Sequence, residues 1–471
     1  MTAPDRRAAE SLLSLVGGTP LVRLVRSAPA AEVHAKLEYL NPGGSVKDRA
    51  ALAMVLDAEE TGALRRGGTI VEGTSGNTGL GLAQVAAARG YRSLFVLPDK
   101  TAVEKLDALR AYGAEIVLTP SALPREHPDH VIAYATRLAK ETEGGWLADQ
   151  YGNPANPDVH RRTTGPEIWE ATGGRITHLV STIGTGGTIT GTGQYLHEVS
   201  GGRVQVVGAD PVTSAYGSGD GSPFAIEAAG HYIHPETATD VFPDVYRREV
   251  IDRFLTIPDR ESILTARALA RTEGLLVGGS SGTAAAAALR VARDAGPDAV
   301  VVAILPDSGR AYLSKYHSDT WVRRQGFLDD DRSGTLVDLM SPVVTVPVAT
   351  SVGQARSVLE SSGQPALPVV LAGRSSRFPP AAGEVLGLLL PDDLRGSPDA
   401  TVRVPPSPPV GIGSGETAAE ALERLAPDVE VVHLVRDGRL AGLVTVGALR
   451  AREHPRGHST RKCPRGRRPS R

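Results

Sequence analysis

The chain has 471 residues with 51 basic and 53 acidic side chains, so its length predicts roughly three domains and its charge indicates neither nucleic acid nor a membrane surface as a partner. The single cysteine, Cys463, excludes an intramolecular disulfide and a cysteine metal cluster. No apolar run approaches the roughly 20 residues of a membrane-spanning helix and no signal-peptide core is visible, which predicts a cytoplasmic protein.

The first stretch with a candidate catalytic residue is Asn41–Arg49, which reads Asn-Pro-Gly-Gly-Ser-Val-Lys-Asp-Arg. Its proline and glycines predict a loop, Ser45 is expected to be the N-cap, and a helix is expected from Ala50 onward. Lys47 then lies in the first helical turn. The helix dipole and a loss of solvation would both lower the pKa of Lys47 and suit its amine to Schiff-base formation. Taken alone, the stretch fits a solvated surface lysine better, and only the rest of the chain favours a reactive amine.

From about residue 15 to residue 328, β-branched runs alternate with alanine-rich stretches. The predicted strands are Thr69–Val71, Ser93–Leu97, Glu115–Leu118, His178–Thr182, Val204–Gly208 and Val300–Leu305. The predicted helices are Leu82–Arg89, Val103–Tyr112, Val131–Glu143 and Thr283–Ala295. This alternation predicts a layered α/β protein with mostly parallel strands and ligands bound in the loops after the strands.

Three loops in this part are rich in glycine and hydroxyl residues: Glu72–Gly79, Gly184–Thr188 and Gly278–Gly282. The first two follow predicted strands, and the third follows the apolar run Leu275–Val277. Glycine lets backbone amides approach a ligand closely, and each following helix presents its N-terminus. Because Gly184–Thr188 has no charged side chain, it is expected to bind a phosphate through amides and hydroxyls.

The sequence pattern changes after Leu328, where a polar linker precedes two related halves of about 50 residues each. The first half spans 344–394 and is interrupted by an expected loop insertion at 372–382, and the second spans 402–449. The expected organisation is a catalytic domain at 1–328, a linker at 329–335, a paired module at 336–450 and a basic, disordered tail at 451–471.

Several motifs in this order resemble the pyridoxal-phosphate-dependent cysteine synthase and cystathionine β-synthase family. They are Gly18–Leu24, Asn41–Arg49, Thr74–Thr78, Gly184–Thr188, Gly279–Ser280 and Leu305–Gly309. The resemblance covers about the first 330 residues and implies a fold type II, tryptophan-synthase-β-like catalytic domain with two parallel-sheet α/β subdomains. The two C-terminal halves resemble a tandem pair of cystathionine β-synthase (CBS) domains.

The resemblance also implies roles for individual residues. Lys47 would hold pyridoxal 5′-phosphate covalently and act as the general base, Asn77 would bind the ring hydroxyl oxygen, and Ser280 would meet the pyridine nitrogen. The phosphate would be bound by Gly184, Thr185, Gly186, Gly187 and Thr188, and the substrate carboxylate by Thr74, Ser75, Gly76, Thr78 and Gln150. A serine does not hold a proton on the pyridine nitrogen, which favours β-elimination over transamination.

The implied reaction is β-replacement on L-serine or an activated serine. Homocysteine would give cystathionine, whereas sulfide with O-acetylserine or O-phosphoserine would give cysteine. The CBS pair favours homocysteine, but the family's Glu-Gly-Ile-Gly stretch at the second-substrate entrance here reads Glu227-Ala-Ala-Gly230, followed by a longer segment, His231–Thr237. His231 and His234 are expected to pack in this loop, and no metal site is expected. The resemblance also implies a homodimer or a higher homo-oligomer.

CBS repeats that bind adenosyl nucleotides usually keep a threonine and, three residues later, an aspartate for the ribose. Here Leu390 replaces the threonine that would precede Asp393, and Ala448 replaces the aspartate that would follow Thr445. We therefore expect weak or absent binding of adenosylmethionine.

Three other interpretations remain open from the residues. Gly278–Gly282 fits the nucleophile elbow of a serine hydrolase, with His317 as a base. Gly76, Gly79 and Gly81 with Asp99 resemble a Rossmann turn, although their spacing is wrong for it. A binding protein that has lost catalysis is the third interpretation, and the intact Lys47 argues against it.

Overall fold

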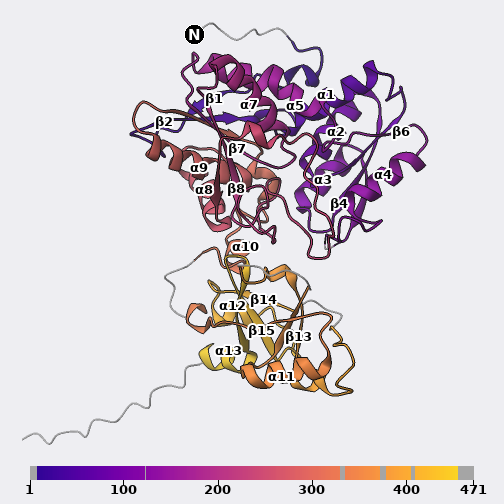
Figure 1. The fold of residues 1–471 in the computed structure, drawn as a ribbon, viewed down its shortest axis with the longest axis vertical. Coiled ribbons are helices and arrows are strands. Elements are labelled where there is room, and N and C mark those ends of the chain that lie inside the picture. Colours follow the sequence, from indigo (N-terminus) through magenta and orange to yellow (C-terminus); the bar gives the residue numbers. More distant parts are fainter. Residues whose placement is uncertain (1–7, 122, 329–334, 372–377, 405–408, 454–471) are drawn as a thin grey trace, which may run out of the picture. The chain divides into compact units, whose positions relative to one another are not determined.

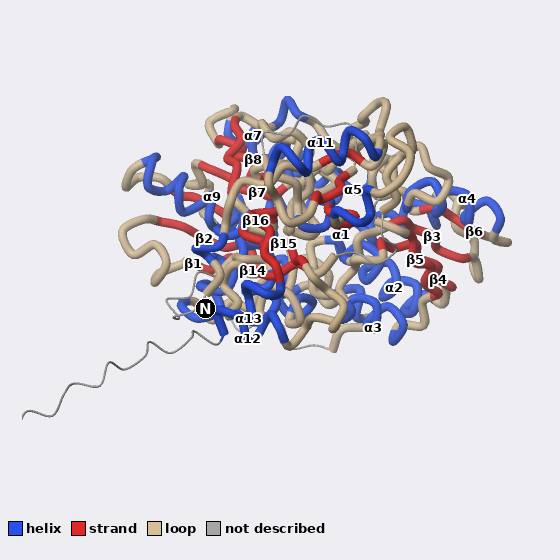
Figure 2. The backbone as a smooth tube through the Cα atoms, turned by 90° about the horizontal axis from the view of Figure 1, so that it is seen from below, coloured by secondary structure: helices blue, strands red, loops and turns tan. Residues whose placement is uncertain are grey.

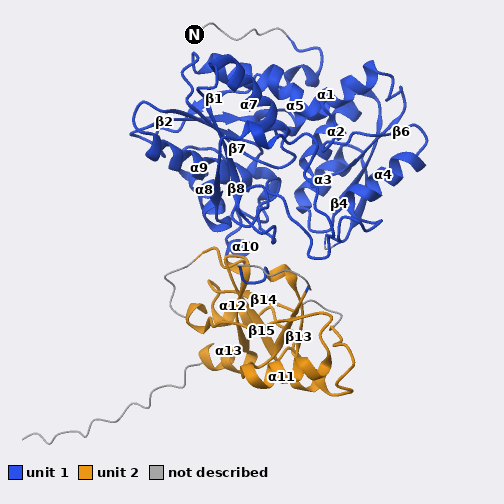
Figure 3. Ribbon diagram, viewed as in Figure 1, with its two compact units in different colours: residues 1–322, 371–381 blue, residues 323–370, 382–471 orange. Residues whose placement is uncertain are grey.

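The computed structural model describes residues 8–121, 123–328, 335–371, 378–404 and 409–453. The chain divides into two compact units, residues 1–322 with 371–381 and residues 323–370 with 382–471 (Figure 3). The first unit ends at Val322, before the expected boundary at residue 328. The reason is local: Gln325 and Gly326 accept backbone hydrogen bonds from Gly438 and Asp437 and so belong to the second unit. All of the predicted cofactor and substrate residues lie in the first unit.

The first unit contains two sheets (Figure 1). The six-stranded sheet has the order β1 (Leu21–Arg23), β2 (Glu32–Leu37), β10 (Val300–Leu305), β7 (His178–Thr182), β8 (Gln205–Pro211) and β9 (Arg253–Ile257). The four-stranded sheet has the order β5 (Glu115–Thr119), β4 (Arg92–Pro98), β3 (Thr69–Gly73) and β6 (Gly145–Leu147). Every pair is parallel except β1 with β2, which confirms the predicted α/β class.

Helices pack on both faces of each of these two sheets. Figure 2 colours the helices blue and the strands red. The helices are α1 (Lys47–Glu60), α2 (Asn77–Arg89), α3 (Val103–Ala111), α4 (Val131–Glu141), α5 (Ala155–Val159), α6 (Gly165–Ala171), α7 (Gly187–Ser200), α8 (Asp259–Thr272) and α9 (Gly279–Ala295). A further helix, α10 (Asp319–Arg324), crosses the unit boundary, and a π-helical turn, His160–Thr164, joins α5 to α6.

Strand β10 shows why both faces must be covered. All six of its residues, Val-Val-Val-Ala-Ile-Leu, are buried. Val301 and Ala303 pack with α8 and α9, whereas Val302 and Ile304 pack with α6 and α7. Successive strand residues point to opposite faces, so a continuous apolar run needs helices on both sides. The four-stranded sheet is likewise covered by α1, α2 and α3 on one face and by α4 on the other.

Two helices begin earlier than the sequence predicts. Helix α2 begins at Asn77 instead of Leu82, and α9 begins at Gly279 instead of Thr283, so parts of two glycine loops form first helical turns. Close packing explains the glycines: a Cβ at Gly81 would lie 3.0 Å from the Cβ of Ala51 in α1. Tertiary packing has overridden the low helix propensity of glycine. The apolar run Leu275–Val277 is not a strand and forms only an isolated bridge.

The second unit contains two three-stranded sheets with the same internal pattern. In each, the first strand pairs in parallel with the second, and the second pairs antiparallel with the third. The first half comprises β11 (Val346–Pro347), α11 (Val352–Ser362), β12 (Leu367–Val370) and β13 (Val385–Leu389). The second comprises β14 (Gly411–Gly413), α12 (Ala418–Leu422), β15 (Val431–Arg436), β16 (Arg439–Thr445) and α13 (Val446–Glu453).

The helix expected at the end of the first half is absent from its described residues: Pro391–Leu394 forms only a short 3-10 turn, which starts with a proline. In the second half the corresponding residues do form a helix, α13, which continues to Glu453 into the region predicted as tail. Most of the expected linker and loop insertion, and the tail from residue 454 with Cys463, lie outside the described residues. No helix in the described ranges combines the length and hydrophobicity needed to cross a bilayer.

Candidate active site

Lys47 is the first residue of α1 and lies in a pocket at the carboxyl ends of the six-stranded sheet. The N-cap is Val46 instead of the predicted Ser45, although the Ser45 hydroxyl still accepts a hydrogen bond from the Lys47 amide at 3.2 Å. The side chain is partly buried, and this burial lowers the pKa of Lys47 to about 8, against an opposing effect of the Asp307 charge. The amine is therefore uncharged in roughly a tenth of the molecules at pH 7, far more than for an ordinary lysine.

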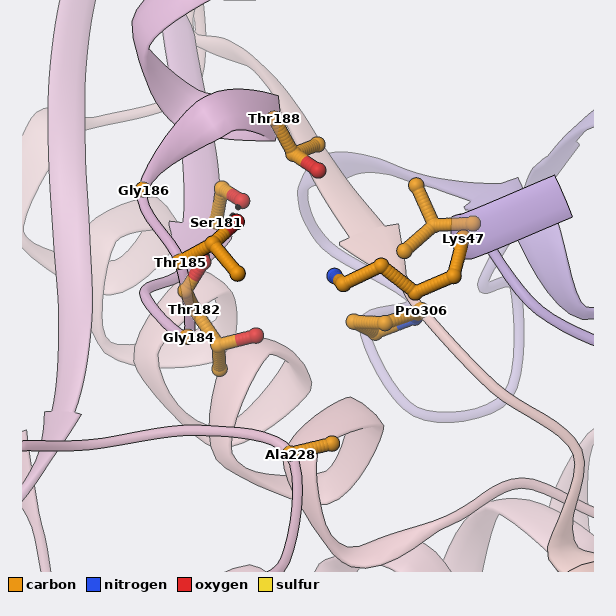
Figure 4. Close-up of a pocket in the computed structure, with 10 residues that line it drawn as sticks. Lys47, Ser181, Thr182, Gly184, Thr185, Gly186, Thr188, Ala228 and Pro306 are labelled. Carbon is orange, nitrogen blue, oxygen red and sulfur yellow. Dashed lines mark hydrogen bonds between the residues drawn. The ribbon is translucent and has the colours of Figure 1, made fainter. Parts of the chain in front are cut away.

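The loop between β7 and α7 faces the Lys47 side chain (Figure 4). The pocket is lined by Val46, Lys47, Ser181, Thr182, Gly184, Thr185, Gly186, Thr188, Ala228 and Pro306. Apart from Lys47, none of these lining residues carries a charge. The backbone amides of Thr185 and Gly186 donate no hydrogen bond to any described residue. An anion beside α7 would therefore be bound by amides, hydroxyls and the helix N-terminus.

Two contacts around this glycine cradle (Gly184–Thr188) explain its composition. A Cβ at Gly187 would lie 2.2 Å from the side-chain oxygen of Asn156, so no larger residue fits there. The Thr188 hydroxyl lies 3.2 Å from Nε2 of the buried His160. Burial, followed by the charges of Arg49 and Lys47, holds the pKa of His160 well below its usual value. The imidazole is therefore neutral and adds no charge to the cradle.

Asn77 and Ser280, the two predicted contacts of the cofactor ring, are brought together by Asp307. The Asn77 amide donates to one carboxylate oxygen of Asp307 at 2.8 Å, and the Ser280 hydroxyl donates to the other at 3.2 Å. Tyr312 donates to Asp307 as well, at 2.5 Å. Asp307 was not predicted as a site residue, although it lies within the motif Leu305–Gly309. That motif was the signal that could have identified it.

The five predicted carboxylate-binding residues lie after β3 and after β6. Thr74 and Gly76 form a tight turn, in which the Gly76 amide donates to the Thr74 hydroxyl at 3.0 Å. Thr78 donates to the side-chain oxygen of Gln150 at 2.5 Å, so the structure brings these two together. Ser75 is exposed to solvent. Hydroxyl, amide and backbone donors gathered around one turn suit a carboxylate.

A charged cluster that was not predicted lies against this turn. The ammonium of the buried Lys105 donates a hydrogen bond to Glu227 at 3.0 Å and another to the Tyr312 hydroxyl at 2.8 Å. Lys315 contacts the other oxygen of Glu227 at 2.5 Å. Burial alone would raise the pKa of Glu227, but the two ammonium groups hold it below its usual value. A Cβ at Gly76 would lie 2.5 Å from the Lys105 side chain.

Glu227 belongs to the stretch expected at the second-substrate entrance, so its neighbourhood could have been inferred. Lys105 lies in the helix α3, whose sequence has no distinctive motif, and nothing local identified it. Within Glu227-Ala-Ala-Gly230, Ala228 has a φ of +64°, a left-handed backbone conformation that is uncommon for alanine. The Ala228 carbonyl approaches Gly184, where a Cβ would lie 2.8 Å from it.

The remaining interpretations of the sequence gain no geometric support. His231 pairs with Asp240 at 2.8 Å, and the described residues contain no group of three or more potential metal ligands. The Ser280 hydroxyl bonds to Asp307, whereas His317 faces the Val277 carbonyl at 2.9 Å. A serine hydrolase needs its serine and histidine in contact, and these two have other partners. In the proposed Rossmann turn, Gly79 and Gly81 lie inside α2.

Known proteins resemble the chain along most of its length. A family profile described as "Pyridoxal-phosphate dependent enzyme" matches residues 12–307. Cystathionine β-synthase of Apis mellifera is 44% identical over 322 residues, which cover 67% of this chain and 63% of that protein. Cystathionine β-synthase of Dictyostelium discoideum is 38% identical over 381 residues, 77% of this chain and 75% of that protein.

Shorter relatives match the first unit. Cysteine synthase B of Escherichia coli is 45% identical over 306 residues, covering 64% of this chain and 94% of that protein. The crystal structure of an O-ureido-L-serine synthase superposes with a TM-score of 0.60 at 42% identity, covering 66% of this chain and 95% of that one. The chain thus spans slightly less than two thirds of the honeybee protein and almost the whole of the shorter relatives.

Proposed function

The chain belongs to the pyridoxal-phosphate-dependent enzyme family, and on that basis we propose that it replaces the β-substituent of L-serine, or of an activated serine, with L-homocysteine to give L-cystathionine. When bound, pyridoxal 5′-phosphate supplies the electron sink that makes the substrate α-proton acidic. The main support is Lys47, a partly buried amine with a lowered pKa, facing a glycine cradle without charged side chains. The relatives named cystathionine β-synthase support this reaction.

The residues present fit the cofactor. Thr185 and Gly186 have backbone amides without a partner among the described residues, and Gly187 has no room for a Cβ. These features suit a phosphate bound by backbone donors at the start of α7. Lys47 would hold the cofactor covalently, and Asn77 and Ser280 would contact its ring. Asp307 would orient both of these side chains, because each of them donates to its carboxylate.

Lys47 would also move the proton at the reacting carbon. A general base is most effective when its pKa lies near the working pH, and burial brings the pKa of Lys47 to about 8. The turn Thr74–Thr78 with Gln150 would hold the substrate carboxylate and so present the α-carbon to Lys47. The short contact between Thr78 and Gln150 supports a shared ligand for these two residues.

The choice of thiol is supported by the cluster of Lys105, Glu227 and Lys315. Homocysteine carries an ammonium and a carboxylate besides its thiol, whereas sulfide carries neither. Two lysines and a glutamate beside the substrate turn provide partners for both charged groups of an amino-acid thiol. Sulfide has neither an ammonium nor a carboxylate, so these side chains would not add to its binding. Cysteine synthesis from sulfide with O-acetylserine or O-phosphoserine is the second candidate, supported by the cysteine synthase relatives.

We further propose that the second unit is a tandem CBS-domain pair. Its two sheets repeat one strand order and one pattern of parallel and antiparallel pairing, which supports a duplicated module. A homodimer or a higher homo-oligomer in the cytoplasm remains our proposal for the assembly and location of the chain.

A product assay tests the reaction. Serine, O-acetylserine and O-phosphoserine are each combined with homocysteine and with sulfide, and the products are identified by mass spectrometry. We expect cystathionine from serine and homocysteine in the wild-type protein and none from Lys47→Ala. Turnover of the sulfide pairs alone would replace this proposal with the second candidate, and full activity of Lys47→Ala would exclude both.

A further inference from the structure

Four aromatic rings of the segment 216–246 form a cluster beside the glycine cradle. Ring centroids of Tyr216 lie 5.2 Å from His231, 5.4 Å from Phe242 and 4.7 Å from Tyr246. The His231 ring is in turn fixed by its 2.8 Å contact with Asp240. This aromatic cluster includes His231, the first residue of the segment after Gly230 that is longer than the family pattern. The proposed reaction assigns no role to the cluster.

The Tyr216 hydroxyl donates a 2.6 Å hydrogen bond to the backbone carbonyl of Gly184, the first residue of the cradle. Tyr216 is 5% exposed, and this burial is the largest cause that raises its pKa well above the usual value. The hydroxyl therefore keeps its proton and remains a donor. One stacked contact, with Phe242, and two tilted contacts, with His231 and Tyr246, prevent the phenol from turning away.

The bonded carbonyl belongs to the same peptide unit as the Thr185 amide. In a trans peptide the C=O and N–H bonds point in opposite directions. A carbonyl that points towards Tyr216 therefore aims the Thr185 N–H away from Tyr216. That amide donates to no described residue, and Thr185 lines the pocket that contains Lys47. A hydrogen bond to the carbonyl also polarises the peptide and strengthens its N–H as a donor.

We propose that Tyr216 is a positioning residue for the cofactor phosphate: by holding the Gly184 carbonyl, it orients and strengthens the Thr185 amide as a phosphate donor. This inference rests on the proposed cofactor site and does not depend on which substrates the enzyme uses. The aromatic cluster then has a function, because it fixes Tyr216 in the orientation that the cradle requires.

Tyr246 provides a matched control within the same cluster. Its ring is tilted by 54° against the Tyr216 ring, and Tyr246 packs closely against Gly186. Its buried hydroxyl, however, has no hydrogen-bond partner among the described residues. Tyr216→Phe and Tyr246→Phe therefore remove the same atom from neighbouring rings, and only the first removes a contact with the cradle.

The test uses full-length protein loaded with pyridoxal 5′-phosphate. We expect Tyr216→Phe to raise the dissociation constant of the cofactor by about 10-fold, as for the loss of one hydrogen bond, and to shift the phosphorus NMR signal of the bound phosphate. We expect Tyr246→Phe to stay within about 2-fold of wild type with an unchanged phosphorus signal. Circular dichroism and the melting temperature of each variant check that the fold is intact.

Unchanged cofactor affinity and phosphorus signal in Tyr216→Phe would overturn the inference, and so would an equal loss in both variants. If Tyr216→Phe does not fold, 3-fluorotyrosine at position 216 keeps the hydroxyl and makes it a stronger donor. Cofactor binding must then be as tight as in wild type or tighter, and weaker binding would count against the inference. Because neither readout needs a substrate, a wrong assignment of the reaction would not affect the result. Loss of visible cofactor absorbance in Lys47→Ala checks the cofactor attachment separately.

Discussion

The side-chain amide of Asn77 lies 2.8 Å from a carboxylate oxygen of Asp307, although the two residues are 230 positions apart in the chain. Ser280 and Tyr312 donate to the same carboxylate. Asp307 is 1% exposed, so these donors satisfy a carboxylate that water does not reach. This buried carboxylate joins the start of α2 to the start of α9, and both proposed ring contacts depend on it.

Replacing Asp307 with Asn should therefore disturb both contacts. An amide places an NH2 group where the carboxylate had an accepting oxygen, so at least one of the three donors loses its partner, at a cost of about 1–3 kcal/mol in unfolding free energy for each. Removing the negative charge that raises the pKa of Lys47 should lower this pKa below about 8. Urea unfolding measures the first effect, and the pH dependence of cofactor attachment measures the second.

Ser281→Ala is the matched control for Asp307→Asn. The Ser281 hydroxyl reaches only the backbone carbonyl of Asp307, at 3.4 Å, and not its carboxylate. The control should leave the pKa of Lys47 unchanged. An unchanged pKa in Asp307→Asn as well would contradict the electrostatic coupling between Asp307 and Lys47.

Lys47 should show its lowered pKa directly in cofactor-free protein. Only the uncharged amine attacks an aldehyde, so the rate of cofactor attachment should rise with pH and level off above about 8. With an ordinary lysine, the rate would continue to rise until the pH reached about 10.5. A stopped-flow absorbance series measures this profile. A plateau only near the ordinary lysine value would show that the site is open to water in solution.

The same shift predicts a pH-dependent stability. Since the folded-state pKa of Lys47 is below the unfolded value, the unfolded chain binds more protons between about pH 8 and 10.5. The unfolding free energy of cofactor-free wild type should therefore rise across this window relative to Lys47→Met. The difference between the two proteins should be constant below pH 8, where Lys47 is charged in both states.

Local patterns predicted most of the catalytic fold. The observed bounds of β7 and β10, His178–Thr182 and Val300–Leu305, are the predicted ones, because continuous β-branched runs bounded by turns are typical of buried parallel strands. Lys47 was also correctly expected in the first turn of a helix and to have a lowered pKa. The strand bounds and the helix start have causes within a few residues, whereas the pKa of Lys47 also depends on burial in a pocket that distant residues complete.

The errors and omissions involve distant residues. The early start of α2 depends on packing against α1, and the role of Asp307 depends on donors 5, 27 and 230 positions away. Lys105 meets Glu227 across 122 positions and Tyr312 across 207. No local pattern encodes such contacts, because periodicity and caps report only on neighbours along the chain.

The buried pair of Arg49 and Glu38 should contribute strongly to stability. Arg49 forms bonds of 2.8 and 2.9 Å to Glu38, and two of 2.7 Å to Glu167. Burial opposes ionisation, but Arg49 and Lys36 lower the pKa of Glu167 to about 2. Glu38→Gln leaves a buried guanidinium partly uncompensated, so we expect a loss of about 3 kcal/mol in chemical denaturation.

The exposed pair of Arg161 and Glu198, at 2.7 Å, is the control for this measurement. Its side chains are 49% and 65% exposed, so water and salt screen their attraction. Glu198→Gln should cause no measurable loss of stability. Equal effects of Glu38→Gln and Glu198→Gln would contradict a structural role for burial at Arg49.

Adenosylmethionine should bind weakly or not at all to the full-length protein. The two polar side chains that remain at the expected ribose positions are engaged in local caps: Asp393 accepts from the Leu390 amide at 2.8 Å, and Thr445 accepts from the Ala448 amide at 3.2 Å. A nucleotide would have to break these contacts to bind through its ribose. In neither half would it find the second polar side chain, because Leu390 and Ala448 stand at those positions. Isothermal titration calorimetry on the full chain measures the binding. Micromolar affinity would contradict this prediction.

Lys105→Met should distinguish between the two candidate thiols. Methionine keeps much of the aliphatic volume against Gly76 but removes the ammonium, and Lys315 remains to neutralise Glu227. We expect kcat/KM for homocysteine to fall by roughly 10- to 100-fold, the loss of about 1.4–2.8 kcal/mol of charged contact, while any turnover with sulfide stays within about 2-fold. Initial rates at varied thiol concentration measure both values. An equal loss with both thiols would show that Lys105 supports the fold of the site and does not recognise an amino-acid thiol.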